Sequence, residues 1–173
     1  YEKFLKIKLS KSTLAKLAYE IERIDCKING GSQDQYAAAF GGFNYIKFQK
    51  NKNVIVNSLK LERNKINNLE SYLLLYFTGV SRSSSKIIVQ QNKRILNENK
   101  NAIDALKEIK KYVNSMKSAL INEKIEKMAS LLEKAWNKKK KTSSLIENSF
   151  IRQIHNFVIK NGALAAKISG AGG

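Results

Sequence analysis

Apolar residues in the first part of the chain follow a helical pattern that glycines interrupt. Between Ser10 and Ile24 the apolar residues recur at steps of three and four, which predicts an amphipathic helix that begins at Ser10. Two pairs of glycines, at 30–31 and at 41–42, then bracket residues 32–40. Because glycines commonly mark the ends of regular elements, we expect a loop that leads into a short helix there.

Four segments beyond this helix have the composition or the side-chain size of strands. Residues 43–48 and 54–61 are rich in β-branched and aromatic side chains, and the polar segment between them predicts a hairpin. Residues 72–77 form a short uninterrupted apolar run, which predicts a central strand buried on both faces. Residues 163–169 have small side chains, and we expect a strand packed closely on a neighbour.

The second half of the sequence is helical in pattern. Apolar residues from Ile95 to Leu120 keep one helical register up to a break near Asn122, and another helix leads to Trp136. Hydroxyl residues at 142–144 could cap a last helix, whose apolar positions lie between 145 and 158. Since strands precede helices, the predicted fold class is α+β.

Composition and charge narrow the classes of function. The chain has 173 residues, 32 basic against 14 acidic residues, and a net charge of +18, which points to an anionic partner. Only five of the basic residues are arginine, so solvated lysines on helix faces are favoured over a nucleic-acid interface, and a basic nucleic-acid-binding protein is the alternative. No apolar stretch approaches the about 20 residues of a membrane span. The single cysteine predicts a reducing, cytoplasmic setting.

The chain begins with Tyr1 and stops within a run of small residues. We therefore expect it to be a piece of a longer protein.

One carboxylate, Asp34, stands among amides directly after the first glycine pair. It could cap the short helix. It could instead orient and deprotonate an acceptor hydroxyl, which is the work of a general base. Only three aspartates occur in the chain, so few candidates compete for that role.

A second candidate segment follows the predicted central strand at residues 77–85. Three side chains there, Ser81, Arg82 and Ser83, place hydroxyls around one guanidinium before a helix start. Free backbone N–H groups at such a start and an arginine together suit an anion. A helix start with several serine caps is the equally weighted alternative.

The third candidate segment is the glycine-rich end of the chain. Glycines let backbone amides approach phosphate oxygens closely, but the spacing fits neither a P-loop nor a dinucleotide fingerprint. Its candidate residues are Lys167, Ser169, Gly170, Ala171, Gly172 and Gly173.

In this order the three segments resemble those of the GHMP kinases, the family of galactokinase, homoserine kinase and mevalonate kinase. The resemblance covers nearly the whole chain. Within the family, the sequence most resembles the bacterial kinases of D-glycero-D-manno-heptose 7-phosphate. The segments that carry this narrower match are residues 33–44, 74–79, 81–83, 135–136 with the lysines that follow, 162–164 and Lys167.

The resemblance implies an incomplete two-domain GHMP kinase fold. Residues 1–66 would be the remainder of the N-terminal domain and residues 67–173 a truncated C-terminal domain. The substrate motif and the ATP loop that begin the family's N-terminal domain are not found in this sequence. By the resemblance Asp34 is the catalytic carboxylate. The residues it places around the substrate are Gln33, Gln35 and Tyr36; we add Ser81, Arg82 and Ser83 for a sugar-borne phosphate. The glycine-rich end would lie next to ATP.

The implied activity is transfer of the ATP γ-phosphate, with Mg²⁺, to the anomeric hydroxyl of a sugar phosphate. D-glycero-D-manno-heptose 7-phosphate would give the 1,7-bisphosphate, and a galactokinase-like or fucokinase-like kinase is the alternative. The implied partners are the sugar phosphate and ATP, with neither nucleic acid nor membrane, and a homodimer is left open. No residue of the chain is predicted to bind a metal directly, and the fragment alone is expected to be inactive.

Overall fold

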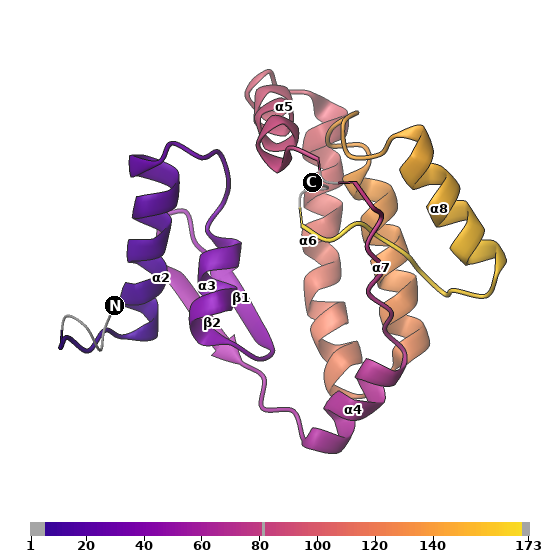
Figure 1. The fold of residues 1–173 in the computed structure, drawn as a ribbon, viewed down its shortest axis with the longest axis horizontal. Coiled ribbons are helices and arrows are strands. Elements are labelled where there is room, and N and C mark those ends of the chain that lie inside the picture. The colour runs from indigo at the N-terminus through magenta and orange to yellow at the C-terminus, as the bar shows by residue number, and fades with distance from the viewer. Residues whose placement is uncertain (1–5, 81, 171–173) are drawn as a thin grey trace. The chain divides into compact units, whose positions relative to one another are not determined.

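The computed structural model describes residues 6–80 and 82–170, and the chain forms two compact units (Figure 1). The first unit is Tyr1–Leu61 and the second is Glu62–Gly173. The boundary that we predicted after residue 66 falls inside the helix α4, Arg63–Ser71, at the start of the second unit. The described elements are helices and one small sheet, in agreement with the α+β class.

The first unit begins with the predicted amphipathic helix. Helix α2, Lys11–Tyr19, starts at Ser10, whose hydroxyl accepts a hydrogen bond of 3.0 Å from the N–H of Thr13. The helix then widens into a π-helical turn, η1, Glu20–Asp25. A π turn places its residues at a different angle about the axis from an α turn, and such turns are frequent at functional sites.

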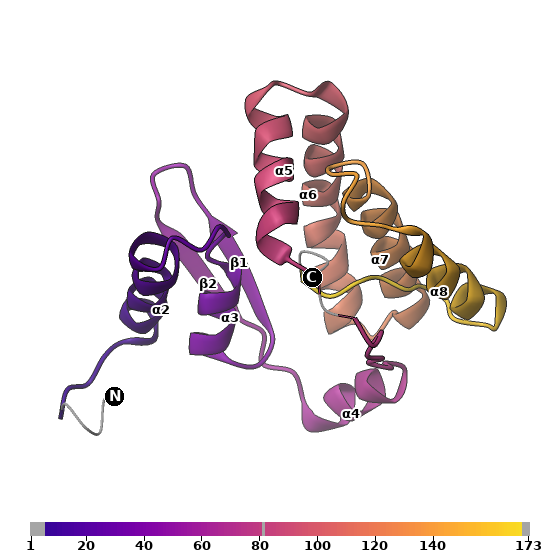
Figure 2. The same ribbon diagram turned by 45° about the horizontal axis from the view of Figure 1, so that its top comes forward.

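The remaining elements of the first unit confirm the predicted short helix and hairpin. Helix α3, Gln33–Phe40, packs beside α2, and it leads into the antiparallel strands β1, Asn44–Phe48, and β2, Val54–Ser58 (Figure 2). Ile46 pairs with Val56 at the centre of the hairpin.

The second unit is built from helices. The pattern between Ile95 and Leu120 is divided at residues 97–99, where Asn99 accepts a hydrogen bond of 3.0 Å from the N–H of Ala102 and so starts a new helix. The longest two described helices, α6 and α7, pack side by side, and α5 lies against α6 (Figures 1 and 2). The helices after α4 are α5, Ser84–Leu96; α6, Lys100–Ile121; α7, Ile125–Lys139; and α8, Ser149–Lys160.

The core of the second unit gathers around Trp136, which is 1% exposed, and Ile146, which is fully buried. Thr142 and Ser143 are also buried, and their hydroxyls bond to Lys139 O and to the Gln90 amide. The hydroxyls at 142–144 therefore do not cap the last helix. Asn148 caps α8 by accepting a hydrogen bond of 2.8 Å from the N–H of Ile151.

Two predicted strands are wrong. Residues 72–77 have no regular structure, and their side chains are 62–92% exposed. Residues 163–169 also form no strand. A strand needs a neighbour that pairs with its backbone N–H and C=O groups, and the described residues of the second unit contain no sheet. No helix among the described residues is both long and apolar enough to span a bilayer.

We predict that Ile146→Ala lowers the free energy of unfolding by about 2–5 kcal/mol, because it leaves a cavity beside Trp136. The adjacent Leu145 is 44% exposed and provides a matched control, since Leu145→Ala opens no enclosed cavity. Urea unfolding of the full-length protein measures both. Equal losses in the two variants would contradict the placement of the core.

Candidate functional site

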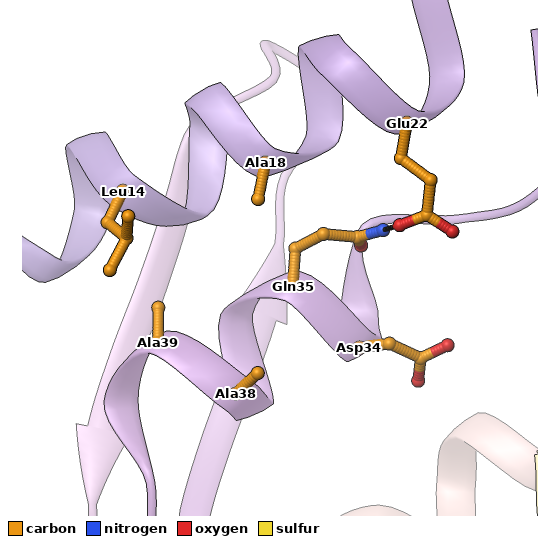
Figure 3. Close-up of a pocket in the computed structure, with 7 residues that line it drawn as sticks. All are labelled: Leu14, Ala18, Glu22, Asp34, Gln35, Ala38 and Ala39. Carbon is orange, nitrogen blue, oxygen red and sulfur yellow. Dashed lines mark hydrogen bonds between the residues drawn. The ribbon is translucent and has the colours of Figure 1, made fainter. Parts of the chain in front are cut away.

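A pocket between α2 and α3 holds the candidate carboxylate in the first unit (Figure 3). Its apolar side chains are one leucine and three alanines, and its polar groups gather at the end where η1 lies beside the start of α3. The residues that line the pocket are Leu14, Ala18, Glu22, Asp34, Gln35, Ala38 and Ala39.

Asp34 is the second residue of α3 and is exposed. Ser32 occupies the position that precedes the helix, so Asp34 is not its cap, although a carboxylate in the first turn is favoured by the helix dipole. Among the described residues the Asp34 carboxylate has no hydrogen-bond or ion-pair partner. Its oxygens are therefore available to accept a proton or a hydrogen bond from a ligand.

Gln35 ties α3 to the helix opposite. Its Nε2 donates a hydrogen bond of 2.5 Å to Glu22 Oε2 (Figure 3), and the residue is 6% exposed. Gln35 Oε1 is buried without a hydrogen-bond partner in the described part of the chain. The bond to Glu22 gives this side chain a structural role. Its predicted contact with the substrate stays a prediction.

The other two predicted substrate residues on α3 differ in exposure. Tyr36 is 3% exposed, and its ring lies 5.8 Å from that of Phe48 and 6.2 Å from that of Phe40, between centroids. It belongs to the core of the first unit. Gln33 is exposed at the first position of α3, where a ligand beside Asp34 could reach it.

Sequence reasoning missed Glu22 and its neighbour Arg23. Arg23 forms an ion pair of 3.0 Å with Glu22 and donates to the carbonyls of Ile28 and Gly31. A signal was present, because Leu14, Ala18 and Glu22 recur every four residues and so share one face of a helix. A charged residue on an otherwise apolar face indicates a polar partner.

The serine and arginine segment lies in the second unit. Ser83 caps α5 and accepts a hydrogen bond of 3.4 Å from the N–H of Lys86. The Arg82 guanidinium donates to Leu145 O at 3.0 Å and to Ile146 O at 2.8 Å. Ser81 lies outside the described residues. Arg82 thus binds the segment before α5 to the segment before α8, and three of its five N–H donors are left for other partners.

Side chains of α7 hold the described part of the glycine-rich end. Glu133 Oε2 accepts hydrogen bonds from the N–H of Ala166 at 3.4 Å and from His155 Nε2 at 3.2 Å. The Lys139 ammonium donates to Gly170 O. The three predicted residues Ala171, Gly172 and Gly173 lie outside the described residues.

Lys139 and Lys167 form a cationic pair at this end. Partial desolvation of the ammonium lowers the pKa of Lys167, although the residue as a whole is exposed. Burial and the charge of Lys167 together lower the pKa of Lys139. Neither lysine has an ion-pair partner among the described residues, so an anion would stabilise both charges. Ser169 lies exposed between Lys167 and Gly170.

The described residues contain no group of three or more His, Cys, Asp or Glu side chains that could hold an ion. Two carboxylates, those of Glu22 and Asp34, line the same pocket. Oxygen ligands of this kind suit Mg²⁺, which commonly takes one or two carboxylates and completes its shell with phosphates and water.

Comparison with known proteins gives two matches to sequence families. Residues 1–42 match the family described as the GHMP kinases N terminal domain, and residues 116–173 match GHMP kinases C terminal. Together the two stretches make up more than half of the chain.

Two curated proteins are similar in sequence over almost the whole chain. The D-glycero-alpha-D-manno-heptose 7-phosphate kinase of Campylobacter jejuni is 41% identical over 172 residues, which are 99% of this chain and 50% of that protein. The bifunctional fucokinase/GDP-fucose pyrophosphorylase of Arabidopsis thaliana is 25% identical over 169 residues, which are 95% of this chain and 16% of that protein. The chain thus spans at most half the length of these relatives.

Two solved structures share the fold. One is a D-glycero-D-manno-heptose 1-phosphate kinase from Bacteriodes thetaiotaomicron, with a TM-score of 0.67 and 36% identity. The other is a putative sugar kinase from Campylobacter jejuni, with a TM-score of 0.64 and 35% identity. Each alignment covers 99% of this chain and 45% of the other.

We predict that Gln35→Glu lowers the free energy of unfolding of the full-length protein at neutral pH by about 1.5–3 kcal/mol. The substitution replaces a hydrogen bond to Glu22 with two carboxylates at that distance. Gln33→Glu, at an exposed position of the same helix, is the matched control and has little effect.

The double variant Glu22→Gln with Gln35→Glu restores a carboxylate–amide pair with its ends exchanged. We expect it to recover most of the lost stability in thermal or urea unfolding. Additive losses in the double variant would contradict the contact.

Proposed function

The chain belongs to the GHMP kinase family, and we propose that the protein of which it forms part is an ATP-dependent kinase of a heptose phosphate. The observation that carries this proposal is an exposed carboxylate, Asp34, without a partner among the described residues and at the start of a helix. Sequence and structure similarity to kinases of phosphorylated heptoses supports the choice of substrate. Because the chain spans about half of those proteins, we infer that the fragment alone is inactive.

In this mechanism Asp34 accepts the proton of the anomeric hydroxyl while the hydroxyl oxygen bonds to the γ-phosphorus of ATP. The bond from that phosphorus to the β,γ-bridging oxygen breaks, and ADP leaves. An anomeric hydroxyl is more acidic than an ordinary alcohol, so a carboxylate is a sufficient base. Catalysis then depends on position and on neutralised charge more than on covalent chemistry.

Magnesium is included in the proposal as the ion that accompanies ATP. When bound, it neutralises phosphate charge. Glu22 and Asp34 are the carboxylates of the described pocket that could contact it. Glu22 already bonds to Arg23 and Gln35, but a carboxylate has more lone pairs than these two contacts use.

The candidate substrates differ in which carbon of the sugar carries the phosphate group. One relative is named for heptose 7-phosphate and a structural neighbour for heptose 1-phosphate. We propose the 7-phosphate as acceptor, with the 1,7-bisphosphate as product, because its anomeric hydroxyl is free to react. A fucokinase-like activity on an unphosphorylated sugar is the second candidate, and the similarity to a bifunctional fucokinase favours it.

We assign several of the other predicted residues to the substrates, most of them to anionic groups. Arg82 and Ser83, with Ser81 outside the described residues, would bind the sugar-borne phosphate, and Gln33 would contact the sugar beside Asp34. Lys167 and Gly170, with Lys139, would face the phosphates of ATP, since the two lysines lack an anionic partner among the described residues. We further propose a cytoplasmic setting, which suits the free, exposed Cys26, and leave the homodimer as an open possibility.

We predict that Asp34→Asn in the full-length protein lowers kcat by about 10²- to 10⁴-fold, because it removes a general base without changing side-chain size. Asp104→Asn, on the exposed surface of α6, is the matched control and leaves kcat unchanged. ADP release with heptose 7-phosphate measures both. Full activity of Asp34→Asn would show that another group accepts the proton.

Arg82→Ala should weaken the reaction with heptose 7-phosphate far more than the reaction with unphosphorylated heptose, because an arginine–phosphate contact exists only in the first case. The ratio of the two kcat/KM values measures this preference. Arg82→Ala also removes the bonds to Leu145 O and Ile146 O. Equal loss on both sugars would therefore assign Arg82 to the fold and not to the phosphate.

A further inference from the structure

We propose that Arg23 is a positioning residue for Asp34, since its guanidinium clamps the loop that leads into α3. The proposal rests on the catalytic role that we gave to Asp34. It concerns a residue that neither the motifs of the sequence nor the pocket lining includes.

The clamp consists of two hydrogen bonds from one side chain to one loop. Arg23 Nε donates to Gly31 O at 3.1 Å, and Arg23 Nη1 donates to Ile28 O at 3.3 Å. The arginine side chain is 10% exposed, and Nη1 also lies 3.0 Å from Glu22 Oε1. A planar guanidinium with fixed donor directions holds two carbonyls in one relative position, which a single ammonium would not do.

Gly30, between the two bonded carbonyls, leaves the space that the guanidinium occupies. A Cβ at position 30 would lie 2.3 Å from Arg23 Cζ, and its three nearest atoms would all belong to Arg23. The φ angle of Gly30 lies outside the left-handed region, so its backbone conformation does not itself require glycine. The close approach of Arg23 accounts for glycine at this position.

The clamped loop continues directly into the helix of the candidate base. Gly31 is followed by Ser32, which precedes α3, and Asp34 lies in the first turn. Glu22 holds the same turn through Gln35. Consecutive residues of η1 therefore fix both sides of the helix start, one through the loop and one through α3.

Loss of the clamp should act on the rate and not on ATP affinity. A displacement of a catalytic group by about 1 Å can cost on the order of 100-fold in rate. We therefore expect kcat to fall about 10- to 100-fold in Arg23→Ala, with the KM for ATP unchanged. Arg23→Lys keeps the charge but cannot donate to both carbonyls in the same way, and its kcat should lie between those of wild type and Arg23→Ala.

A double-mutant cycle in the full-length protein tests the clamp. Gly30→Ala displaces the guanidinium, which is the mobile end of a long side chain, so it should lower kcat to a similar extent with little loss of stability. The variant Arg23→Ala with Gly30→Ala should be no slower than Arg23→Ala alone, because the obstacle to the new methyl group has gone. The proposal would be overturned if the two losses in kcat multiplied in the double variant, or if the single variants had the wild-type kcat.

Two matched variants control for the chemistry of the substitutions. Arg63→Ala removes an exposed arginine of α4 and should leave kcat unchanged. Gly31→Ala places a methyl group with nothing within 4 Å, so it should cost much less than Gly30→Ala. An equal loss in both glycine variants would assign the effect to the stiffer loop backbone and contradict the clamp.

Hydrogen exchange of the amides at 28–34 gives a readout that does not depend on activity. Faster exchange in Arg23→Ala and in Gly30→Ala supports the clamp, and unchanged exchange overturns it. If Arg23→Ala folds poorly, the exchange rates of Gly30→Ala alone decide between these outcomes. Asp34→Asn separates the two proposals. If Asp34→Asn is fully active, the role proposed for Asp34 is wrong, and hydrogen exchange still tests the clamp. If Asp34→Asn is inactive while Arg23→Ala and Gly30→Ala have the wild-type kcat, only the clamp is wrong.

Discussion

The contact between the π turn at the end of α2 and the start of α3 is the constraint on which the candidate site depends. Glu22 binds the Gln35 amide at 2.5 Å, and Arg23 binds two carbonyls of the preceding loop. The apolar part of the pocket between these helices is formed by Leu14 and three alanines, whose side chains make no directional bonds. The directional bonds from η1 therefore set where the Asp34 carboxylate lies, and packing of Tyr36 against Phe48 fixes the other side of α3.

In the second unit, side chains hold a segment that has no regular secondary structure. Residues 163–170 form neither helix nor strand, so backbone pairing does not hold them. Instead Glu133 bonds to the N–H of Ala166, Lys139 bonds to Gly170 O, and Ile168 packs on the core around Trp136. The position of a glycine-rich segment is thus set by three side chains, two of them charged residues of α7.

Local sequence signals predicted the elements whose stabilising contacts are local. The cap at Ser10, the hairpin and the short helix before Gly41 were confirmed because turn residues and side-chain periodicity lie within each element. The run at 72–77 was misassigned because apolar composition does not say whether a pairing strand exists. Asp34 stood out as a lone acid, whereas Glu22 and Arg23 went unnoticed. The helical spacing placed Glu22 on an apolar face, but it did not identify the partners of these two residues, which lie 5–13 residues away and are brought near only by the fold.

We propose that the full-length protein phosphorylates the anomeric hydroxyl of a heptose 7-phosphate with Asp34 as the base. Phosphorus NMR of a reaction with ATP tests this most directly, because a phosphate on the anomeric oxygen couples to the anomeric proton. We expect a new anomeric phosphate signal that grows with ADP and is almost lost in Asp34→Asn. ADP release without that signal, or a phosphate on another carbon, would contradict it.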